Sequence, residues 1–168
     1  MTPLQAGDKA PMFTLTDQNG DIFNLAEALK SHQVLVYFYP KAMTPGCTVQ
    51  AQNLRDIKTE LAEHNTIAVG ISPDAVKRLS KFAERDELNF LLLSDEDHSV
   101  ADQFGVWGLK KFMGKEFDGI HRLSFLIDGE GKIAKVFDGT NKIKSADYKF
   151  KTKTHHEVVL EALQAYTA

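Results

Sequence analysis

Apolar runs alternate along this chain with segments in which apolar residues recur every three or four positions. The first long run is Val34–Tyr39, six apolar or aromatic residues followed by Pro40. A run of this kind, bounded by proline, predicts a buried central strand. Two shorter apolar runs, Thr66–Ile71 and Phe90–Leu93, predict further strands. The pattern therefore indicates a sheet whose middle strand precedes residue 40.

Helical spacing begins directly after that strand. Thr44-Pro45 predicts the start of a helix, because Thr is a good N-cap and Pro is favoured at the first helical position. The residues that should share the buried face of this helix are Cys47, Ala51, Leu54, Ile57 and Leu61. Further helices are expected after Ser72-Pro73-Asp74, after Ser94–Asp97 and around Val158–Leu163.

Turn sequences predict a hairpin near each end of the chain. Asn19-Gly20 lies between two short apolar stretches and predicts an N-terminal β-hairpin. Asp128–Gly131 separates two apolar strands and predicts a second hairpin. The segment that follows residues 105–108, as far as Gly119, is expected to be irregular. The lysines within Lys142–Lys153 are expected to lie in a solvated loop.

Strands that alternate with helices and close in a hairpin and a helix predict an α/β domain with a mixed sheet. The β-α-β start and β-β-α finish have the order of the thioredoxin fold. At 168 residues the chain is expected to form one domain, residues 1–168, with a sizeable core. The predicted fold is thus thioredoxin-like, with a mixed central sheet flanked by helices and an N-terminal β-hairpin.

Composition narrows the classes of partner. A formal net charge of −3 gives no reason to expect nucleic acid or an anionic membrane. One cysteine excludes an intramolecular disulfide framework and Cys-rich zinc sites. No secretory signal is visible at the N-terminus, and no apolar run approaches the length of a membrane span. We therefore expect a cytoplasmic protein with no metal and no cofactor.

Cys47 is the residue most suited to chemistry. It falls in the first turn of the predicted helix, where unpaired N–H groups and the helix dipole favour an anion. A thiol so placed loses its proton more easily than a free cysteine, and the thiolate is the reactive form. The alternative is a small buried hydrophobe, the usual role of a lone cysteine. The strand–loop–helix setting favours the reactive role.

The surrounding residues resemble a known family. Pro40-x-x-x-Thr44-x-x-Cys47 matches the peroxiredoxin active-site motif, and Tyr37–Gln50 is similar to the bacterioferritin-comigratory-protein (Q-type) branch. The resemblance extends from Gly7 to the last helix. It implies a thioredoxin fold with an added N-terminal hairpin. It also implies antioxidant reduction of hydrogen peroxide and alkyl hydroperoxides to water and alcohols by a cysteine thiol.

The resemblance also implies the roles of four residues, of which Cys47 is the nucleophile. Thr44 can direct its hydroxyl toward the sulfur or the bound peroxide, or it can simply cap the helix. Pro40 fixes the loop over the thiolate and equally ends the central strand. Residues 121–128 resemble the segment that supplies the family's arginine, so Arg122 is expected beside Cys47. The alternative for Arg122 is a guanidinium that reaches water.

Other candidates carry less weight. Gln50 could line the pocket, although a solvated position is the commoner one for a helix glutamine. Trp107 with Phe104 could shield the site, although an aromatic pair is more often core. Ser94–His98 lacks the spacing of a calcium loop. The side chains of His155 and His156 would point about 100° apart on a helix, which does not suit a shared metal.

One departure from the branch affects turnover. Many members carry a second, resolving cysteine where this chain has Gln52, and others carry one near the position of Ala83. The sulfenic acid of Cys47 must then react with an external thiol, such as thioredoxin, glutaredoxin or glutathione, or with Cys47 of another subunit. A monomer is expected rather than a dimer. A non-enzymatic binding or holdase module of the same fold is the second hypothesis, and the complete Pro-Thr-Cys set with Arg122 favours the enzyme.

Overall fold

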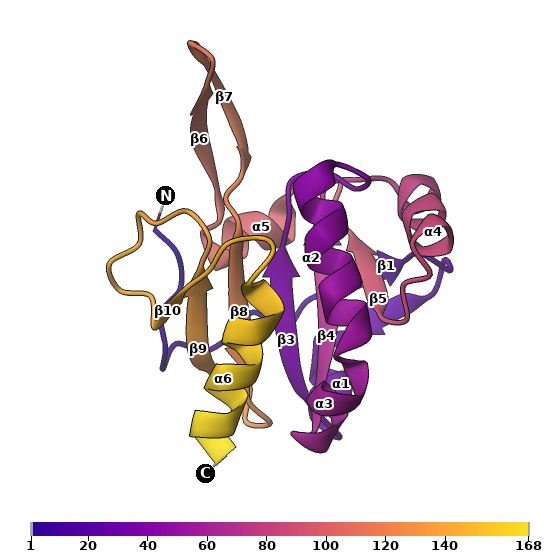
Figure 1. The fold of residues 1–168 in the computed structure, drawn as a ribbon, viewed down its shortest axis with the longest axis vertical. Coiled ribbons are helices and arrows are strands. Elements are labelled where there is room, and N and C mark those ends of the chain that lie inside the picture. Colours follow the sequence, from indigo (N-terminus) through magenta and orange to yellow (C-terminus); the bar gives the residue numbers. More distant parts are fainter. Residues whose placement is uncertain (1, 168) are drawn as a thin grey trace.

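The computed structural model describes residues 2–167, with the side chains of residues 2–166. In this part of the chain, eight strands form one central sheet (Figure 1). Across the sheet their order is β10 (Tyr148–Lys149), β9 (Ile133–Asp138), β8 (Leu123–Ile127), β3 (Gln33–Phe38), β4 (Thr66–Ser72), β5 (Leu91–Ser94), β1 (Thr14–Asp17) and β2 (Ile22–Asn24). β3 is parallel to β4 and antiparallel to β8, so the sheet is mixed, as predicted.

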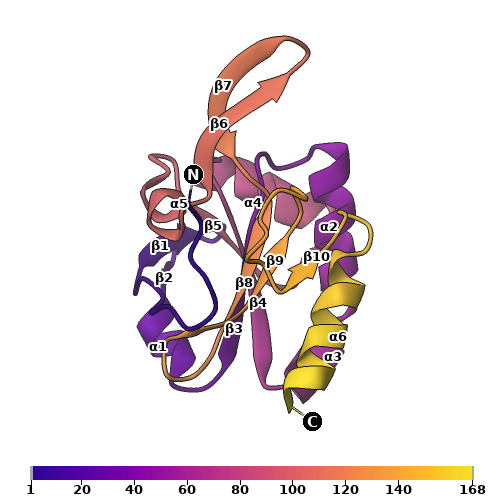
Figure 2. The same ribbon diagram turned by 90° about the vertical axis from the view of Figure 1, so that its left-hand side faces the viewer.

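Helices cover both faces of the sheet (Figure 2). One face packs against α2 (Pro45–Asp56), α3 (Lys58–Glu63), α4 (Val76–Arg85) and α6 (His155–Thr167), and the other against α1 (Leu25–Leu29) and α5 (Ser99–Phe104). The side chains of β3 alternate between the two faces. Leu35 and Tyr37 pack in the core under α2, α3, α4 and α6, and Val36 and Phe38 pack in the core under α1 and α5. Side chains of successive strand residues point to opposite faces, so a strand buried on both sides must be apolar throughout.

The elements around Cys47 form where the sequence predicts them. The N-terminal hairpin pairs β1 with β2, and its turn contains Gly20 at φ +84°. Thr44 is the N-cap of α2, with Pro45 as the first helical residue. All five residues of the predicted buried face, from Cys47 to Leu61, are buried. The helix is interrupted at Ile57, which separates α2 from α3.

The expectation of an irregular segment before Gly119 is wrong. β6 (Trp107–Phe112) and β7 (Lys115–Ile120) form a separate antiparallel sheet, and this β6–β7 arm projects from the body (Figure 1). Its two-residue turn, Met113-Gly114, has positive φ at both positions, as type I′ hairpins require. Only the base of the arm, at Trp107 and Ile120, packs against the core, and residues 111–118 are exposed. The sequence of the arm therefore lacks the strict alternation that reveals a half-buried strand.

The expectation of a solvated loop over Lys142–Lys153 is also wrong in part. The lysines are exposed, but the segment between them is fixed to the sheet. The buried Asp138 carboxylate accepts hydrogen bonds from the backbone N–H groups of Thr140, Lys142 and Ile143, at 2.7, 3.1 and 2.9 Å. Phe150 is only 7% exposed. This stretch is therefore an ordered edge of the fold.

Within residues 2–167, every helix is too short or too polar to span a lipid bilayer.

Candidate active site

Cys47 lies at the start of α2, next to the carboxyl end of β3. The chain leaves β3 at Phe38, crosses a short loop and enters α2 at Pro45, so Cys47 is the third helical residue. Its side chain is buried, at 2% exposure. Backbone N–H groups of a first helical turn lack intrahelical partners and point toward the helix start. The sulfur is thus held where negative charge is favoured and bulk water is largely excluded.

Arg122 contacts the sulfur from the segment between β7 and β8. Its Nη2 donates toward Cys47 Sγ at 3.3 Å, across 75 residues of sequence. Among residues 2–167, no carboxylate lies within ion-pair distance of this guanidinium. Its positive charge is therefore not neutralised by a protein acid and faces the thiol. The predicted proximity of Arg122 to Cys47 is confirmed, and the alternative of a guanidinium turned to water is wrong.

Gln50 orients the guanidinium. Its Oε1 accepts a hydrogen bond from Arg122 Nη1 at 2.7 Å, so the two ends of the guanidinium bind different residues of α2. The Gln50 side chain is fully buried, and its Nε2 has no partner within the described part of the chain. The expectation of a solvated Gln50 is therefore wrong. Its spacing of three from Cys47 places it on the same helix face, a signal that could have identified it.

Thr44 binds neither the helix nor the sulfur through its hydroxyl. Oγ1 donates to the carbonyl of Lys41 at 2.8 Å, and the N-cap side chain makes no capping hydrogen bond. The capping role considered from the sequence is therefore absent. Because the hydroxyl hydrogen is committed to Lys41, the oxygen retains lone pairs that can accept from a peroxide O–H. Pro40 is half-buried in the same loop.

The loop between β3 and α2 is anchored by two residues that the sequence analysis did not identify. Asp74 Oδ2 accepts from the N–H of Ala42 at 2.7 Å, and Arg78 Nη2 donates to the Ala42 carbonyl at 2.7 Å. Asp74 and Arg78 also form an ion pair at 3.2 Å. The sequence predicted Asp74 at a helix start, whereas α4 begins only at Val76. Met43, in this loop, adopts φ +64°, a conformation that costs energy for a residue with a side chain.

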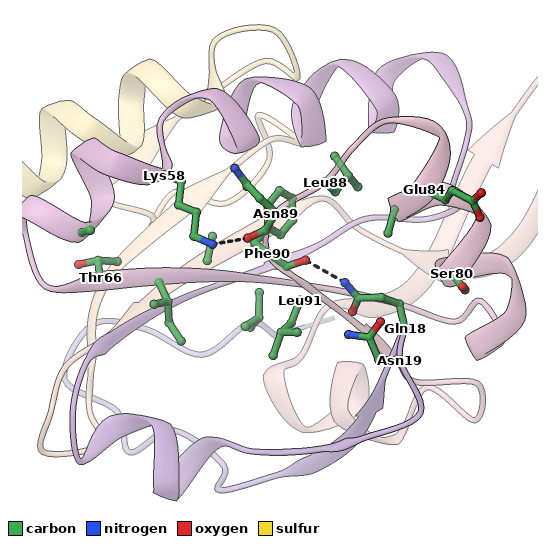
Figure 3. Close-up of a pocket in the computed structure, with 15 residues that line it drawn as sticks. Gln18, Asn19, Lys58, Thr66, Ser80, Glu84, Leu88, Asn89, Phe90 and Leu91 are labelled. Atoms are coloured by element: carbon green, nitrogen blue, oxygen red, sulfur yellow. Dashed lines mark hydrogen bonds between the residues drawn. The ribbon is translucent and has the colours of Figure 1, made fainter.

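Gln52 and Ala83 stand at the two positions where other members of the branch carry a resolving cysteine, and their side chains contact other parts of the molecule. The Gln52 side chain extends to the end of α4, where its Nε2 donates to Asp86 Oδ1 at 3.0 Å. Ala83 lines a cavity of about 620 Å³ beside β4 and β5, which Figure 3 shows with the side chains of Lys58, Glu84 and Phe90 around it. Cys47, Thr44 and Arg122 do not line that cavity. The cavity is therefore separate from the candidate active site.

The remaining candidates are structural. Phe104 is fully buried in the core, and Trp107 stacks on His98 with ring centroids 3.9 Å apart. His155 is fully buried with its Nε2 2.8 Å from Ser124 Oγ, and burial lowers its pKa to about 3. It is therefore neutral at pH 7. Within the described residues, no group of three or more His, Cys, Asp or Glu side chains could hold a metal ion.

Comparison with known proteins identifies the family of this chain. Residues 6–136 match the model of the AhpC/TSA family. The chain belongs to this family. It is 57% identical over 166 residues to Peroxiredoxin Bcp of Escherichia coli strain K12, an alignment that covers 99% of each chain. It is 42% identical over 145 residues to Peroxiredoxin Bcp of Bacillus subtilis, covering 86% of this chain and 90% of that one.

Solved structures agree in fold. Peroxidoxin BcpB of Mycobacterium tuberculosis superposes with a TM-score of 0.80 at 37% identity, covering 96% of this chain and 97% of that one. Peroxiredoxin Q of Xanthomonas campestris gives 0.82 at 29% identity, covering 97% and 99%. The chain is therefore a peroxiredoxin of the Bcp branch, a thiol-dependent peroxidase with a thioredoxin-like fold. Its single cysteine, Cys47, is consistent with a one-cysteine mechanism.

Proposed function

We propose that Cys47 is the peroxidatic residue and that Arg122, Thr44 and Pro40 complete its catalytic site. The observation that carries this proposal is the 3.3 Å contact between Arg122 Nη2 and the Sγ of the chain's only cysteine. The thiolate is the form of cysteine that attacks peroxide, and the Arg122 guanidinium faces the sulfur that carries its charge. It also offers N–H donors to the oxygen on which negative charge develops.

The reaction proceeds by displacement at oxygen. The thiolate attacks one peroxide oxygen and forms an S–O bond while the O–O bond breaks. The attacked oxygen keeps its hydrogen, so Cys47 becomes a sulfenic acid. The departing hydroxide or alkoxide takes a proton from solvent and leaves as water or alcohol. Thr44 Oγ1 accepts a hydrogen bond from the O–H of the attacked peroxide oxygen, because its own hydrogen is donated to the Lys41 carbonyl. Pro40 lacks an N–H, so this part of the loop presents no competing donor.

An external thiol completes the cycle. It attacks the sulfenic sulfur and releases water, and a second thiol then attacks the mixed disulfide and regenerates Cys47. The substrates are hydrogen peroxide and alkyl hydroperoxides, and the reductant is a thiol such as thioredoxin, glutaredoxin or glutathione. Continuous supply of reduced thiol suits the cytoplasm. Residues 1–168 act as one domain, and the protein acts as a monomer. The contacts among Cys47, Gln50 and Arg122 within a single chain support this proposal.

Stopped-flow measurement of Cys47 oxidation tests this proposal against a non-enzymatic binding role. Wild-type protein should be oxidised by hydrogen peroxide far faster than a free thiol, with formation of one sulfenic acid per chain. Cys47→Ser should consume no peroxide while keeping its far-ultraviolet circular dichroism spectrum. If Cys47→Ser retains most of the activity, or if wild type reacts no faster than free cysteine, the assignment is wrong.

A further inference from the structure

Beyond its base, where Trp107 and Ile120 pack against the core, the β6–β7 arm exposes large apolar side chains. Phe112 is 67% exposed, Met113 at the tip 86%, and Phe117 48%. The arm forms its own two-stranded sheet, separate from the central one. An isolated two-stranded ribbon is marginally stable, and clustered exposed apolar residues commonly mark an interaction site. The arm is therefore a surface that lacks a partner within the described chain.

The two faces of the arm differ in charge. The register pairs Lys110 with Phe117 and Phe112 with Lys115, and these four residues share one face, here called the basic-aromatic face. The side chains of Lys110 and Phe117 both lie over Gly119, because a Cβ added to that residue would be 3.2 Å from Lys110 Cδ and 3.6 Å from Phe117 Cε2. This confirms that the two side chains share a face. The arm's two acids, Glu116 and Asp118, fall on the opposite face. The basic-aromatic face therefore carries no acidic side chain.

The basic-aromatic face lies beside the candidate active site. The ammonium of Lys110 donates to the carbonyl of Ile120 at 2.8 Å, two residues before Arg122. Burial lowers the pKa of Lys110, the charge of Arg122 lowers it further, and Cys47 acts in the opposite direction. Lys110 is thus within electrostatic reach of both site residues. Figure 1 shows the arm rising from the same end of the molecule as the start of α2.

If Cys47 forms a sulfenic acid, as the proposed function states, an external thiol must reach it to complete the cycle, and the inference below rests on that function. The chain holds no second cysteine, and Cys47 is only 2% exposed. A bulky thiol cannot reach a sulfur as buried as this one unless the chain around it moves. A partner already bound beside the site reacts far more often than one that merely collides, because tethering raises its effective concentration.

We infer that the basic-aromatic face of the β6–β7 arm is the docking surface for a protein dithiol reductant. The complementary partner surface is apolar around its reactive thiol and acidic at its rim. A small thiol has no surface extensive enough to cover Phe112 and Phe117. A second copy docked through the same face would gather Lys110 and Lys115 of both chains in one interface with no acidic side chain to pair with them. The observations therefore favour a protein partner over both.

Two variants of the arm provide a matched pair for the test. Phe112→Ser with Phe117→Ser removes both rings from the basic-aromatic face, and Leu109→Ser removes a 54% exposed apolar residue from the opposite face. Each protein is assayed at fixed hydrogen peroxide with thioredoxin, thioredoxin reductase and NADPH. The same proteins are assayed with dithiothreitol as the only reductant. Far-ultraviolet circular dichroism checks the fold of each.

The double variant should lose at least tenfold in kcat/KM for thioredoxin, with unchanged peroxide oxidation and unchanged turnover with dithiothreitol. Leu109→Ser should behave as wild type with both reductants. Lys115→Gln, which alters only charge, should weaken the salt dependence of the thioredoxin reaction. An equal loss with dithiothreitol, an equal loss in Leu109→Ser, no loss in the double variant, or a wild-type dimer dissociated by the double variant would each overturn the inference. Failure of the proposed function would differ from these results, because wild-type Cys47 would then not react with peroxide at all.

Discussion

Arg122 is the residue on which the reactivity of Cys47 depends most directly. Its guanidinium is the only cation in direct contact with the sulfur within the described residues, and Gln50 fixes its orientation. An arginine suits this position because its planar fork binds two groups at once and stays charged at all working pH values. Arg122 thus bridges the Gln50 side chain and the sulfur.

Replacement of Arg122 by Met should slow peroxide oxidation of Cys47 about tenfold at pH 7, which corresponds to about 1.4 kcal/mol of lost transition-state stabilisation. The physical reason is the loss of the guanidinium N–H groups that stabilise charge on the departing oxygen. Stopped-flow kinetics at pH 7 measure the rate. Arg85→Met is the matched control, since Arg85 binds Thr48 rather than the sulfur. Equal rates in Arg122→Met and wild type would contradict the role given to Arg122.

Gln52 determines how the enzyme fails at high peroxide. With no second cysteine in the chain, the sulfenic acid waits for an external thiol, and a second peroxide can oxidise it to sulfinic acid. High peroxide should therefore inactivate wild type, and Gln52→Cys should partly protect it, provided α2 unwinds enough to close the bond. Mass spectrometry after graded peroxide doses measures the sulfinic fraction. If wild type stays as sulfenic acid, no more over-oxidised than Gln52→Cys, the missing cysteine does not set the sensitivity.

At the scale of elements, the segment between β9 and α6 is held against the active-site side of the sheet by the Phe150 side chain. The Phe150 ring would lie 2.7 Å from a Cβ at Gly139, so only glycine permits this close approach. The same ring lies 4.5 Å from that of His155. Two residues after Phe150, Thr152 lies near Gly46, where an added Cβ would be 3.5 Å from Thr152 Cγ2 and 3.8 Å from Arg122 Nη2. Anchoring of Phe150 therefore also positions the chain beside the first turn of α2.

Removal of that anchor should destabilise the protein measurably. Phe150→Ala should lower the free energy of unfolding by about 3 kcal/mol, the usual cost of deleting a buried phenylalanine ring. Urea denaturation measures the change. Lys144→Ala, in an exposed position of the same segment, should leave stability within about 0.5 kcal/mol of wild type. A Phe150→Ala protein as stable as wild type would show that the segment is not fastened by its ring.

At the scale of the whole molecule, a neutral buried histidine makes stability dependent on pH. Burial lowers the pKa of His155 from 6.5 to about 3 in the folded protein. Between these values the unfolded chain binds a proton that the folded chain does not, so stability falls as the pH drops below 6.5. At pH 5 the loss from this group is on the order of 2 kcal/mol. His121, whose pKa is also lowered chiefly by burial, acts in the same direction.

Urea denaturation of wild type and His155→Gln at pH 7 and pH 5 tests this dependence. Gln cannot titrate, but it can hydrogen-bond Ser124, so the variant should lose less stability than wild type on acidification. For each protein, the quantity compared is the free energy of unfolding at pH 7 minus that at pH 5. A general loss of packing in the variant lowers both values equally and therefore cancels. Equal losses in the two proteins would show that His155 is not the group responsible.

The amino-acid sequence by itself determined the features that depend on neighbours in the chain. Val34–Tyr39 must be a buried strand, Thr44-Pro45 must begin a helix, and Cys47 must then occupy its first turn. These outcomes follow from the hydrophobic period and the fixed φ of proline, both of which act within a few residues. The resemblance of Tyr37–Gln50 to peroxiredoxins rests on the same local stretch.

Only the tertiary structure decided which distant residues surround the sulfur. The resemblance predicted Arg122 near Cys47, but not that Gln50 would be buried and bind it, nor that Asp74 and Arg78 would hold the loop. The β6–β7 arm was missed because a ribbon that packs against the core only at its base, Trp107 and Ile120, shows no alternation of apolar and polar residues along its length. Contacts between side chains far apart in sequence are set by how strands and helices pack, and no local pattern of residues specifies that packing.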